Sequence, residues 1–203
     1  MPQRRRLNVD ERRQQILAAA RDVYATSSYA DTPVSVIAER AGASPALVFH
    51  YYGSKSGLYT AAVAETIEEL KQRHQVIIDE ATPAGMPLEG IARRLLHTYL
   101  DHIASSRQSW ITGMVGGTEP ASTMAVRQEA RAFYVEQLNK HLTADATVGL
   151  DYALWGFFGF LDEVSLRWLQ QGCPGEHRES LVSAVLSSLA AAVGHAVQDY
   201  PPS

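Results

Sequence analysis

Three polar residues near the middle of the chain, His97, Asp101 and His102, are of types that bind metal ions. In a helix, His97 and Asp101 would share one face, but His102 would be rotated about 140° away from His97. No cysteine and no third histidine lies near them in the sequence. This pattern argues against a metal site, and we expect His97 to line or stabilise the interior of a helical domain.

Motifs typical of enzymes do not occur in the sequence. It has no glycine-rich phosphate loop, no nucleophile elbow and no metalloprotease His-Glu-x-x-His. The single cysteine, Cys173, excludes an intramolecular disulfide bond, and we interpret it as an inert thiol. We therefore expect neither catalytic activity nor a cofactor, and a helical enzyme or ligand-storage protein is the less favoured alternative.

Residues 32–59, TPVSVIAERAGASPALVFHYYGSKSGLY, predict two short helices joined by a tight turn. Thr32 can cap the first helix, and Pro33 suits its first turn because proline lacks the N–H that would be unpaired there. Gly42 suits the turn, since glycine tolerates backbone angles that other residues avoid. Ser44 can then cap a second helix that Pro45 opens and that ends at about Tyr52.

The second helix can be presented to a DNA groove. Ala46 and Phe49 could meet thymine methyl groups, whereas His50, Tyr51 and Lys55 could bind phosphates. The alternative is that its aromatic residues form the core of a three-helix unit. We favour that alternative for Tyr52, and DNA contact for Tyr51 and Lys55. The residues that we expect at the DNA interface are Thr32, Ser44, Pro45, Ala46, Phe49, His50, Tyr51 and Lys55.

The segments IAERAGAS and VFHYYGSKSGL resemble the DNA-binding signature of the TetR (tetracycline-repressor) family of transcription regulators. Turn, recognition helix and following lysine coincide without a gap over about the first quarter of the chain. The resemblance implies an all-helical homodimer that binds DNA and responds to a small molecule. One difference concerns Pro45, Ala46 and Leu47, where many members carry a basic residue that contacts a guanine edge.

The charge distribution agrees with a DNA-binding N-terminal part. The whole chain has a net charge of −4, but residues 1–60 hold eight basic residues against five acidic ones, a charge of +3. The remainder holds ten against seventeen, a charge of −7. Arg4, Arg5 and Arg6 form a basic tail that could follow phosphates or be only a solvated end.

Helical periodicity continues through the rest of the chain, and no alternating β pattern persists. We predict a first helix over residues 9–24, capped by Asp10, and a polar connector over 26–31. Further helices are predicted over residues 55–80, 87–104, 110–115, 123–142, 150–171 and 180–197. The fold class is therefore all-α, with a helix-turn-helix domain in residues 1–55 and a helical ligand-binding and dimerisation domain in residues 56–203.

Aromatic and polar residues of the second domain suggest a site for a small molecule, because apolar walls with few polar groups are typical of such sites. Core packing would explain each of them separately. The candidates are His97, Tyr99, Trp110, Met114, Phe133, Tyr134, Trp155 and Phe158.

The last two predicted helices suggest a partner surface. Residues 150–171 are apolar on nearly every face in the first half, which indicates burial on more than one side. A buried hairpin within one chain is the alternative. The residues that we expect at a homodimer interface are Gly156, Gly159, Leu181, Val185, Leu189 and Val193.

Together with the resemblance, these patterns predict a ligand-responsive, homodimeric transcriptional regulator that binds an inverted-repeat operator in double-stranded DNA. The resemblance implies a repressor, because most members of the TetR family are repressors. Its effector would be small and mainly apolar or aromatic. A constitutive DNA-binding protein without an effector is the second interpretation. We expect a cytoplasmic location, since no apolar run reaches the roughly 18 residues of a membrane span and the arginine-rich start lacks the apolar segment of a secretory signal.

Overall fold

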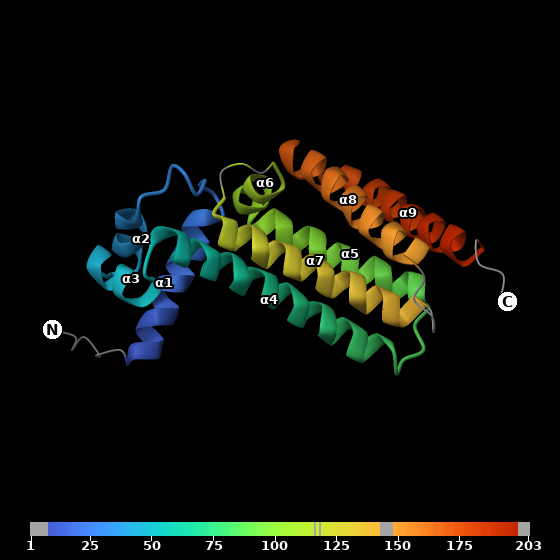
Figure 1. The fold of residues 1–203 in the computed structure, drawn as a ribbon, viewed down its shortest axis with the longest axis horizontal. Coiled ribbons are helices and arrows are strands. Elements are labelled where there is room, and N and C mark those ends of the chain that lie inside the picture. Colours follow the sequence, from blue (N-terminus) through green and yellow to red (C-terminus); the bar gives the residue numbers. More distant parts are fainter. Residues whose placement is uncertain (1–7, 116, 118, 143–147, 199–203) are drawn as a thin grey trace. The chain divides into compact units, whose positions relative to one another are not determined.

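The computed structural model describes residues 8–115, 117, 119–142 and 148–198, and these residues form an all-α fold, as predicted. The basic tail, Arg4 to Arg6, lies outside the described residues. Each predicted helix is found, with ends that differ from the prediction by at most three residues. The helices are α1 (Val9–Tyr24), α2 (Val34–Arg40), α3 (Pro45–Tyr52), α4 (Lys55–Ala81), α5 (Leu88–Ser105), α6 (Arg107–Val115), α7 (Ala121–Leu142), α8 (Val148–Gln170) and α9 (Arg178–Gln198), with a 3-10 turn, η1 (Gly175–His177), before α9 (Figure 1).

Local capping explains where the first helices begin, and it corrects two predictions. Asn8, not Asp10, caps α1, because its side chain accepts a hydrogen bond from the Glu11 N–H at 2.7 Å and Glu11 accepts one from the Asn8 N–H at 2.9 Å. Thr32 does not cap α2, since Pro33 holds the cap position. The Thr32 hydroxyl instead donates to the Ser28 carbonyl at 2.7 Å.

The chain forms two compact units. Unit 1 comprises the described parts of residues 1–68 and 106–126, that is α1 to α3, the first part of α4, α6 and the start of α7. Its core includes the fully buried side chains of Ile16, Ile37, Val48 and Leu58, one from each of the first four helices. Burial of such a side chain contributes roughly 1.5–3 kcal/mol. These contacts hold α2 and α3 against α1 and α4.

Hydroxyl groups fasten the start of α7 to α4 within unit 1. The Thr60 hydroxyl lies 2.9 Å from that of Ser122 and 2.8 Å from that of Thr123, and Thr123 is fully buried. One residue earlier, the Tyr59 hydroxyl donates to a Glu119 carboxylate oxygen at 2.5 Å. These bonds join segments about 60 residues apart in the sequence.

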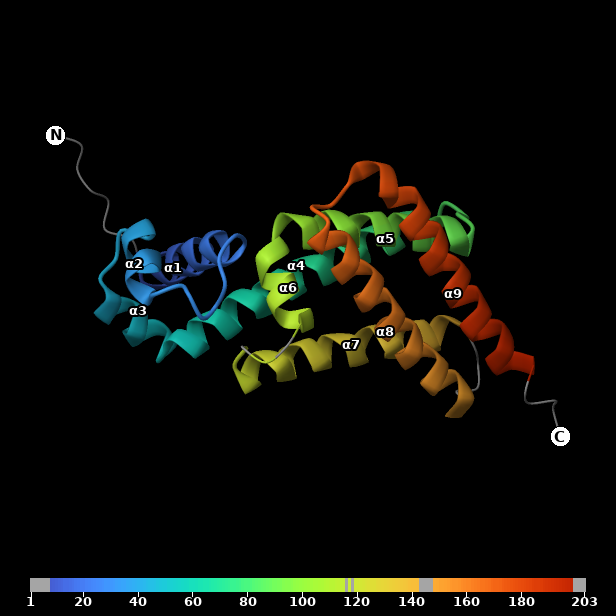
Figure 2. The ribbon, with the colours of Figure 1, turned by 90° about the horizontal axis from the view of Figure 1, so that it is seen from above.

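Unit 2 comprises the described parts of residues 69–105 and 127–203, with the rest of α4, α5, most of α7, α8 and α9. The helices α8 and α9 form an antiparallel pair (Figure 2). Leu150 and Leu154 of α8 are buried with Val135 of α7, and Leu189 and Val193 of α9 pack on this cluster. Among the described helices, none has the length and apolar content needed to cross a membrane.

Candidate nucleic-acid interface and interior site

The turn between α2 and α3 has the backbone conformation that the sequence predicts. Gly42 adopts a φ of 57°, in the left-handed region that favours glycine. The Ala43 N–H donates to the Ala38 carbonyl at 2.8 Å, so a backbone hydrogen bond from the turn caps the C-terminal end of α2. Ser44 caps α3, as predicted, and accepts a hydrogen bond from the Leu47 N–H at 3.2 Å.

Helix α3 buries one side and exposes the other. Val48 is fully buried, while Pro45, Ala46, Phe49 and His50 are exposed. These four residues belong to the set that we expect at a DNA interface, and they lie together on the outer side of α3. Of the same set, Thr32 is only 3% exposed and its hydroxyl donates inward, so it faces the interior of unit 1.

The last residue of α3 and the first residue of α4 are tied to α1 and to the connector that follows α1. The Tyr52 hydroxyl donates to the Arg13 carbonyl at 2.8 Å, which agrees with the structural role favoured for Tyr52. Lys55 Nζ donates to the Ala30 carbonyl at 3.2 Å and lies 4.7 Å from the centre of the Tyr29 ring. Sequence analysis did not find these contacts, because they join residues 25 or more positions apart.

The interior of unit 2 contains a polar pair, His74 of α4 and Tyr134 of α7. Tyr134 Oη lies 3.1 Å from His74 Nδ1, and His74 Nε2 lies 3.1 Å from the Leu95 carbonyl oxygen. Because a carbonyl only accepts, Nε2 carries the proton, and Nδ1 then accepts from the tyrosine. His74 is 9% exposed, and burial lowers its pKa to about 4, so its imidazole is neutral at pH 7.

Sequence analysis missed His74, although a signal for it exists. It lies among the buried residues Ile67, Leu70 and Ile77 at helical spacing on α4, so its position indicates an inward side chain. A buried histidine must find hydrogen-bond partners, and only the folded chain shows which ones it has.

Three of the predicted ligand-binding aromatics come together in unit 2. The Tyr134 ring lies 5.4 Å from that of Phe133 and 6.3 Å from that of Phe158. Tyr99 is also in unit 2 and buried, and burial raises its pKa to about 12. Trp110 and Met114 belong to unit 1.

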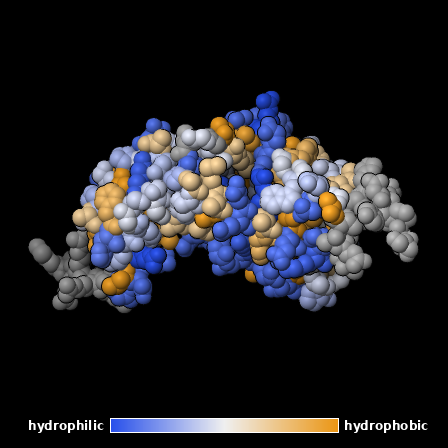
Figure 3. Space-filling view, viewed as in Figure 1, coloured by the Kyte–Doolittle hydropathy of each residue, from blue (hydrophilic) through white to orange (hydrophobic). Residues whose placement is uncertain are grey.

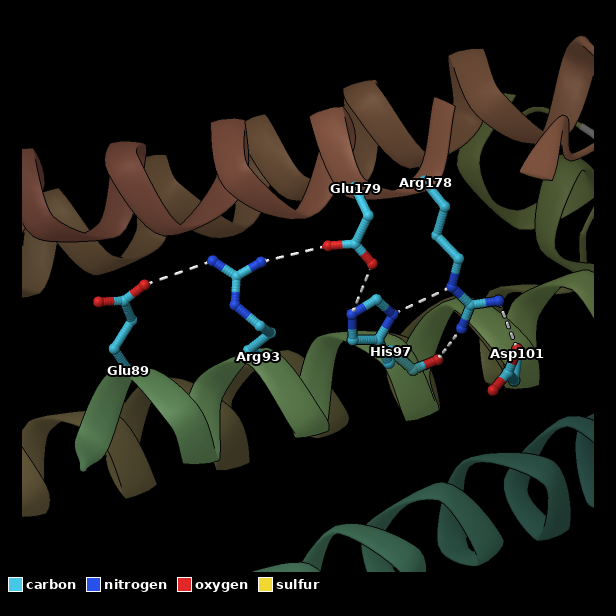
Figure 4. Close-up of polar contacts among 6 residues, drawn as sticks. All are labelled: Glu89, Arg93, His97, Asp101, Arg178 and Glu179. Carbon is cyan, nitrogen blue, oxygen red and sulfur yellow. Dashed lines mark hydrogen bonds and ion pairs between the residues drawn. The ribbon is translucent and has the colours of Figure 1, made fainter. Parts of the chain in front are cut away.

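His97 lies in a polar network between α5 and α9 (Figure 4). Arg178 donates through Nε to His97 Nδ1 at 3.1 Å, through Nη2 to the His97 carbonyl at 2.6 Å, and through Nη1 to Asp101 at 2.6 Å. His97 Nε2 lies 3.2 Å from a Glu179 oxygen. His97 and Asp101 thus share one face, as expected, but their common partner is an arginine. Within the described residues, no cluster of three or more histidine, cysteine or acidic side chains could hold a metal ion.

Arg93 extends this network along α5. Its guanidinium group lies 3.3 Å from Glu179 and 3.3 Å from Glu89. Because both carboxylates are mostly exposed, these two ion pairs contribute little to stability.

The predicted interface residues of α9 face their own chain. Val185 is fully buried, and Leu189 and Val193 pack on the α8 cluster, while Leu181 is half-buried. The outer side of α9 carries small residues, which sequence analysis did not select. They are Ser183, Ala184, Ser187 and Ala191.

Helix α8 exposes a face with large apolar side chains. Tyr152 is 75%, Trp155 39% and Phe160 38% exposed, and Gly156 and Gly159 are exposed with no atom of another residue close enough to contact an added Cβ. Trp155, which we expected at the ligand site, therefore lies on the same outer face as the two glycines.

Sequence comparisons place the N-terminal part among known regulators. Residues 16–62 match the model described as bacterial regulatory proteins, tetR family. An uncharacterised HTH-type transcriptional regulator of Mycobacterium bovis is 30% identical over 147 residues, which are 72% of this chain and 67% of that protein. The HTH-type transcriptional regulator BetI of Stenotrophomonas maltophilia is 39% identical over 61 residues, 30% of this chain and only 31% of BetI.

Solved structures share the fold over nearly the whole chain. A tetR-family transcriptional regulator from Streptomyces coelicolor has a TM-score of 0.76 at 24% identity, over 96% of this chain and 92% of that one. The transcriptional regulator FadR from Bacillus subtilis has a TM-score of 0.66 at 20% identity, over 89% of this chain and 97% of that one. At these identities the likeness concerns the fold alone.

Proposed function

Because the chain belongs to the TetR family of bacterial regulatory proteins, we propose that this DNA-binding transcriptional regulator is a repressor that a small effector releases from its operator. The observation that carries the proposal is the α2–turn–α3 unit, whose capped recognition helix exposes Pro45, Ala46, Phe49 and His50 above a buried core. The N-terminal end of a recognition helix is the part that meets base edges in helix-turn-helix proteins. We assign DNA binding to residues 1–55, and ligand binding and dimerisation to residues 56–203.

Phosphate contacts are assigned to His50, Tyr51 and Lys55. An ammonium group has three N–H donors, so the bond from Lys55 to Ala30 leaves donors for a phosphate. The Tyr29 ring beneath the ammonium group holds it in place before DNA arrives. Phosphate contacts position a protein on DNA without reading the sequence.

The effector site is assigned to the interior of unit 2, around His74, Phe133, Tyr134 and Phe158. Three aromatic rings beside one neutral imidazole and one hydroxyl provide an apolar surrounding with few polar groups. Fold comparison supports the same chemistry, because FadR from Bacillus subtilis was solved in complex with stearoyl-CoA. We therefore expect a mainly apolar effector.

Dimerisation is assigned to the outer faces of α8 and α9. A large exposed apolar patch commonly marks an interaction site, and small side chains on α9 would let a second chain approach closely. A two-fold symmetric dimer presents two recognition helices about one DNA turn, roughly 34 Å, apart, so the operator should be an inverted repeat.

Binding measurements with operator and effector test the proposal. An operator is first selected from random double-stranded DNA, and stearoyl-CoA and free fatty acids of graded length are then screened by thermal shift. For any compound that binds, a coupling free energy of about 1–3 kcal/mol between the two sites predicts that the compound weakens the affinity of the protein for DNA about 5–150-fold. Operator DNA should weaken the binding of the compound by the same factor. Equal ligand affinities with and without operator would instead support a constitutive DNA-binding protein.

A further inference from the structure

We propose that α3 selects its operator through apolar contacts with thymine methyl groups and makes no hydrogen bonds from arginine or lysine to guanine. This inference rests on the proposed function, and it names the class of bases that the DNA interface reads.

The exposed side of α3 is mainly apolar. Phe49 is 44% exposed although it is a large hydrophobic residue, and Ala46, three positions earlier, lies on the same side of the helix. Val36 of α2 is 45% exposed. On the face drawn in Figure 3, hydrophobic residues lie among hydrophilic ones over α2 and α3. An exposed aromatic ring near the middle of a recognition helix, one turn after its N-terminal end, is well placed to be buried against a base.

Guanine recognition needs donors that α3 does not provide. The usual contact is a two-pronged hydrogen bond from arginine or lysine to guanine O6 and N7, and neither residue occurs among residues 45–52. Near α3 in the described chain, Arg40 pairs with Asp22 at 3.0 Å, and Lys55 is held at the Ala30 carbonyl. The Ser44 hydroxyl is engaged as the N-cap of α3, where it accepts a hydrogen bond from the Leu47 N–H.

Thymine offers the group that such a surface can recognise. Its C5 methyl group projects into the major groove and is the only apolar group that distinguishes a base pair there. A phenyl ring and a methyl side chain gain free energy by burying it. Loss of one buried methyl group corresponds to about a fourfold loss of affinity.

The test replaces thymine by deoxyuracil, which removes the methyl group and leaves the base-pairing edge unchanged. In the selected operator, each thymine of a half-site is replaced in turn, and the Kd is measured by fluorescence anisotropy. We expect about a fourfold rise in Kd at one or more positions for the native protein. Phe49→Ala should abolish the difference in Kd between thymine and deoxyuracil at the base that Phe49 contacts, and Phe49→Leu should retain part of this difference. His50→Ala, at the next exposed position, is the matched control. It should weaken binding to both operators and leave the difference in Kd between thymine and deoxyuracil unchanged.

Three results would overturn the inference. One is a Kd that stays within twofold at every deoxyuracil position, and another is a deoxyuracil effect that persists undiminished in both Phe49→Ala and Ala46→Gly. The third is a selected half-site whose binding falls tenfold or more when 7-deazaguanine, which lacks the N7 acceptor, replaces guanine. Failure to select any DNA would contradict the proposed function itself, so the two failures are distinguishable.

Discussion

The buried imidazole of His74 makes the stability of unit 2 depend on pH. In the neutral form its Nδ1 accepts from Tyr134 and its Nε2 donates to Leu95, so both ring nitrogens have partners without a buried charge. Protonation would place a charge on His74, which is only 9% exposed. This burial lowers the pKa of His74 from 6.5 to about 4. The folded chain therefore resists a proton that the unfolded chain accepts.

The expected result is a loss of stability as the pH falls from about 6.5 to about 4. Between these values the unfolded chain binds more protons at His74 than the folded chain does. Protonation of His74 should therefore lower the free energy of unfolding by about 2–3 kcal/mol as the pH falls. Urea denaturation at pH 7 and at pH 4.5 measures the decrease. His74→Gln, which can still donate to Leu95, should show a decrease that is smaller by this amount, whereas the exposed control His50→Gln should behave as the native chain.

Between elements, hydroxyl and guanidinium groups set how neighbouring helices join. Thr60 ties α4 to α7 within unit 1, and Arg178 ties α9 to α5 within unit 2. Both act through several bonds from one side chain, so a conservative substitution can test each of them.

Thr60→Val should destabilise unit 1 by about 1–3 kcal/mol, because it leaves the buried Thr123 hydroxyl without its partner. Hydrogen exchange at the start of α7 should increase in parallel. Thr66→Val is the matched control, since the Thr66 hydroxyl bonds only to Ala62 of its own helix. In the double variant Thr60→Val with Thr123→Val, both partners are apolar, and part of the lost stability should return. Additive losses would contradict the pairing.

Arg178→Lys should cost about 1–2 kcal/mol, since one ammonium group cannot reproduce three bonds from a planar guanidinium group. Arg178 is 25% exposed, whereas Arg93, in the same network, is 37% exposed and faces mostly exposed carboxylates. Arg93→Lys should therefore cost less than about 0.5 kcal/mol. Thermal unfolding of both variants makes the comparison, and equal losses would argue against the central role of Arg178.

For the whole molecule, the proposed homodimer requires a surface that can meet a second chain. The outer face of α8 exposes Tyr152, Trp155 and Phe160, while Leu154 and Phe157 are buried in their own protomer. An aromatic surface next to two exposed glycines fits a close helix contact, and aromatic anchors dominate the energy of many interfaces.

Trp155→Asp should weaken the homodimer at least about 30-fold, because it replaces an apolar anchor with a charge that association would bury. Sedimentation velocity over a range of concentrations measures the change. Val76→Asp, at an exposed apolar position of α4, is the control and should leave the dimer intact. A native chain that is monomeric at micromolar concentration would refute the assignment, as would a dimer unaffected by Trp155→Asp. A weakened dimer should also lose affinity for the inverted repeat more than for a single half-site.

The sequence alone was sufficient for the elements and for the α2–turn–α3 unit, because the signals are local. Helical spacing, the Ser44 cap, Pro45 and the left-handed Gly42 act within a few residues, and they place Phe49 and His50 on one exposed face. The errors at Thr32 and Asp10 are also local, since adjacent residues, Pro33 and Asn8, hold the cap positions.

Tertiary structure decided which side of each later helix is buried and which partners its polar groups find. Helix α8 is apolar nearly all round, so periodicity could not show that Trp155 lies outside while Phe157 lies inside. Likewise, His97 and Arg178 are 81 positions apart, and His74 and Tyr134 are 60 apart. Such pairs depend on how helices pack, and packing is a sum over many distant side chains that no short stretch of sequence contains.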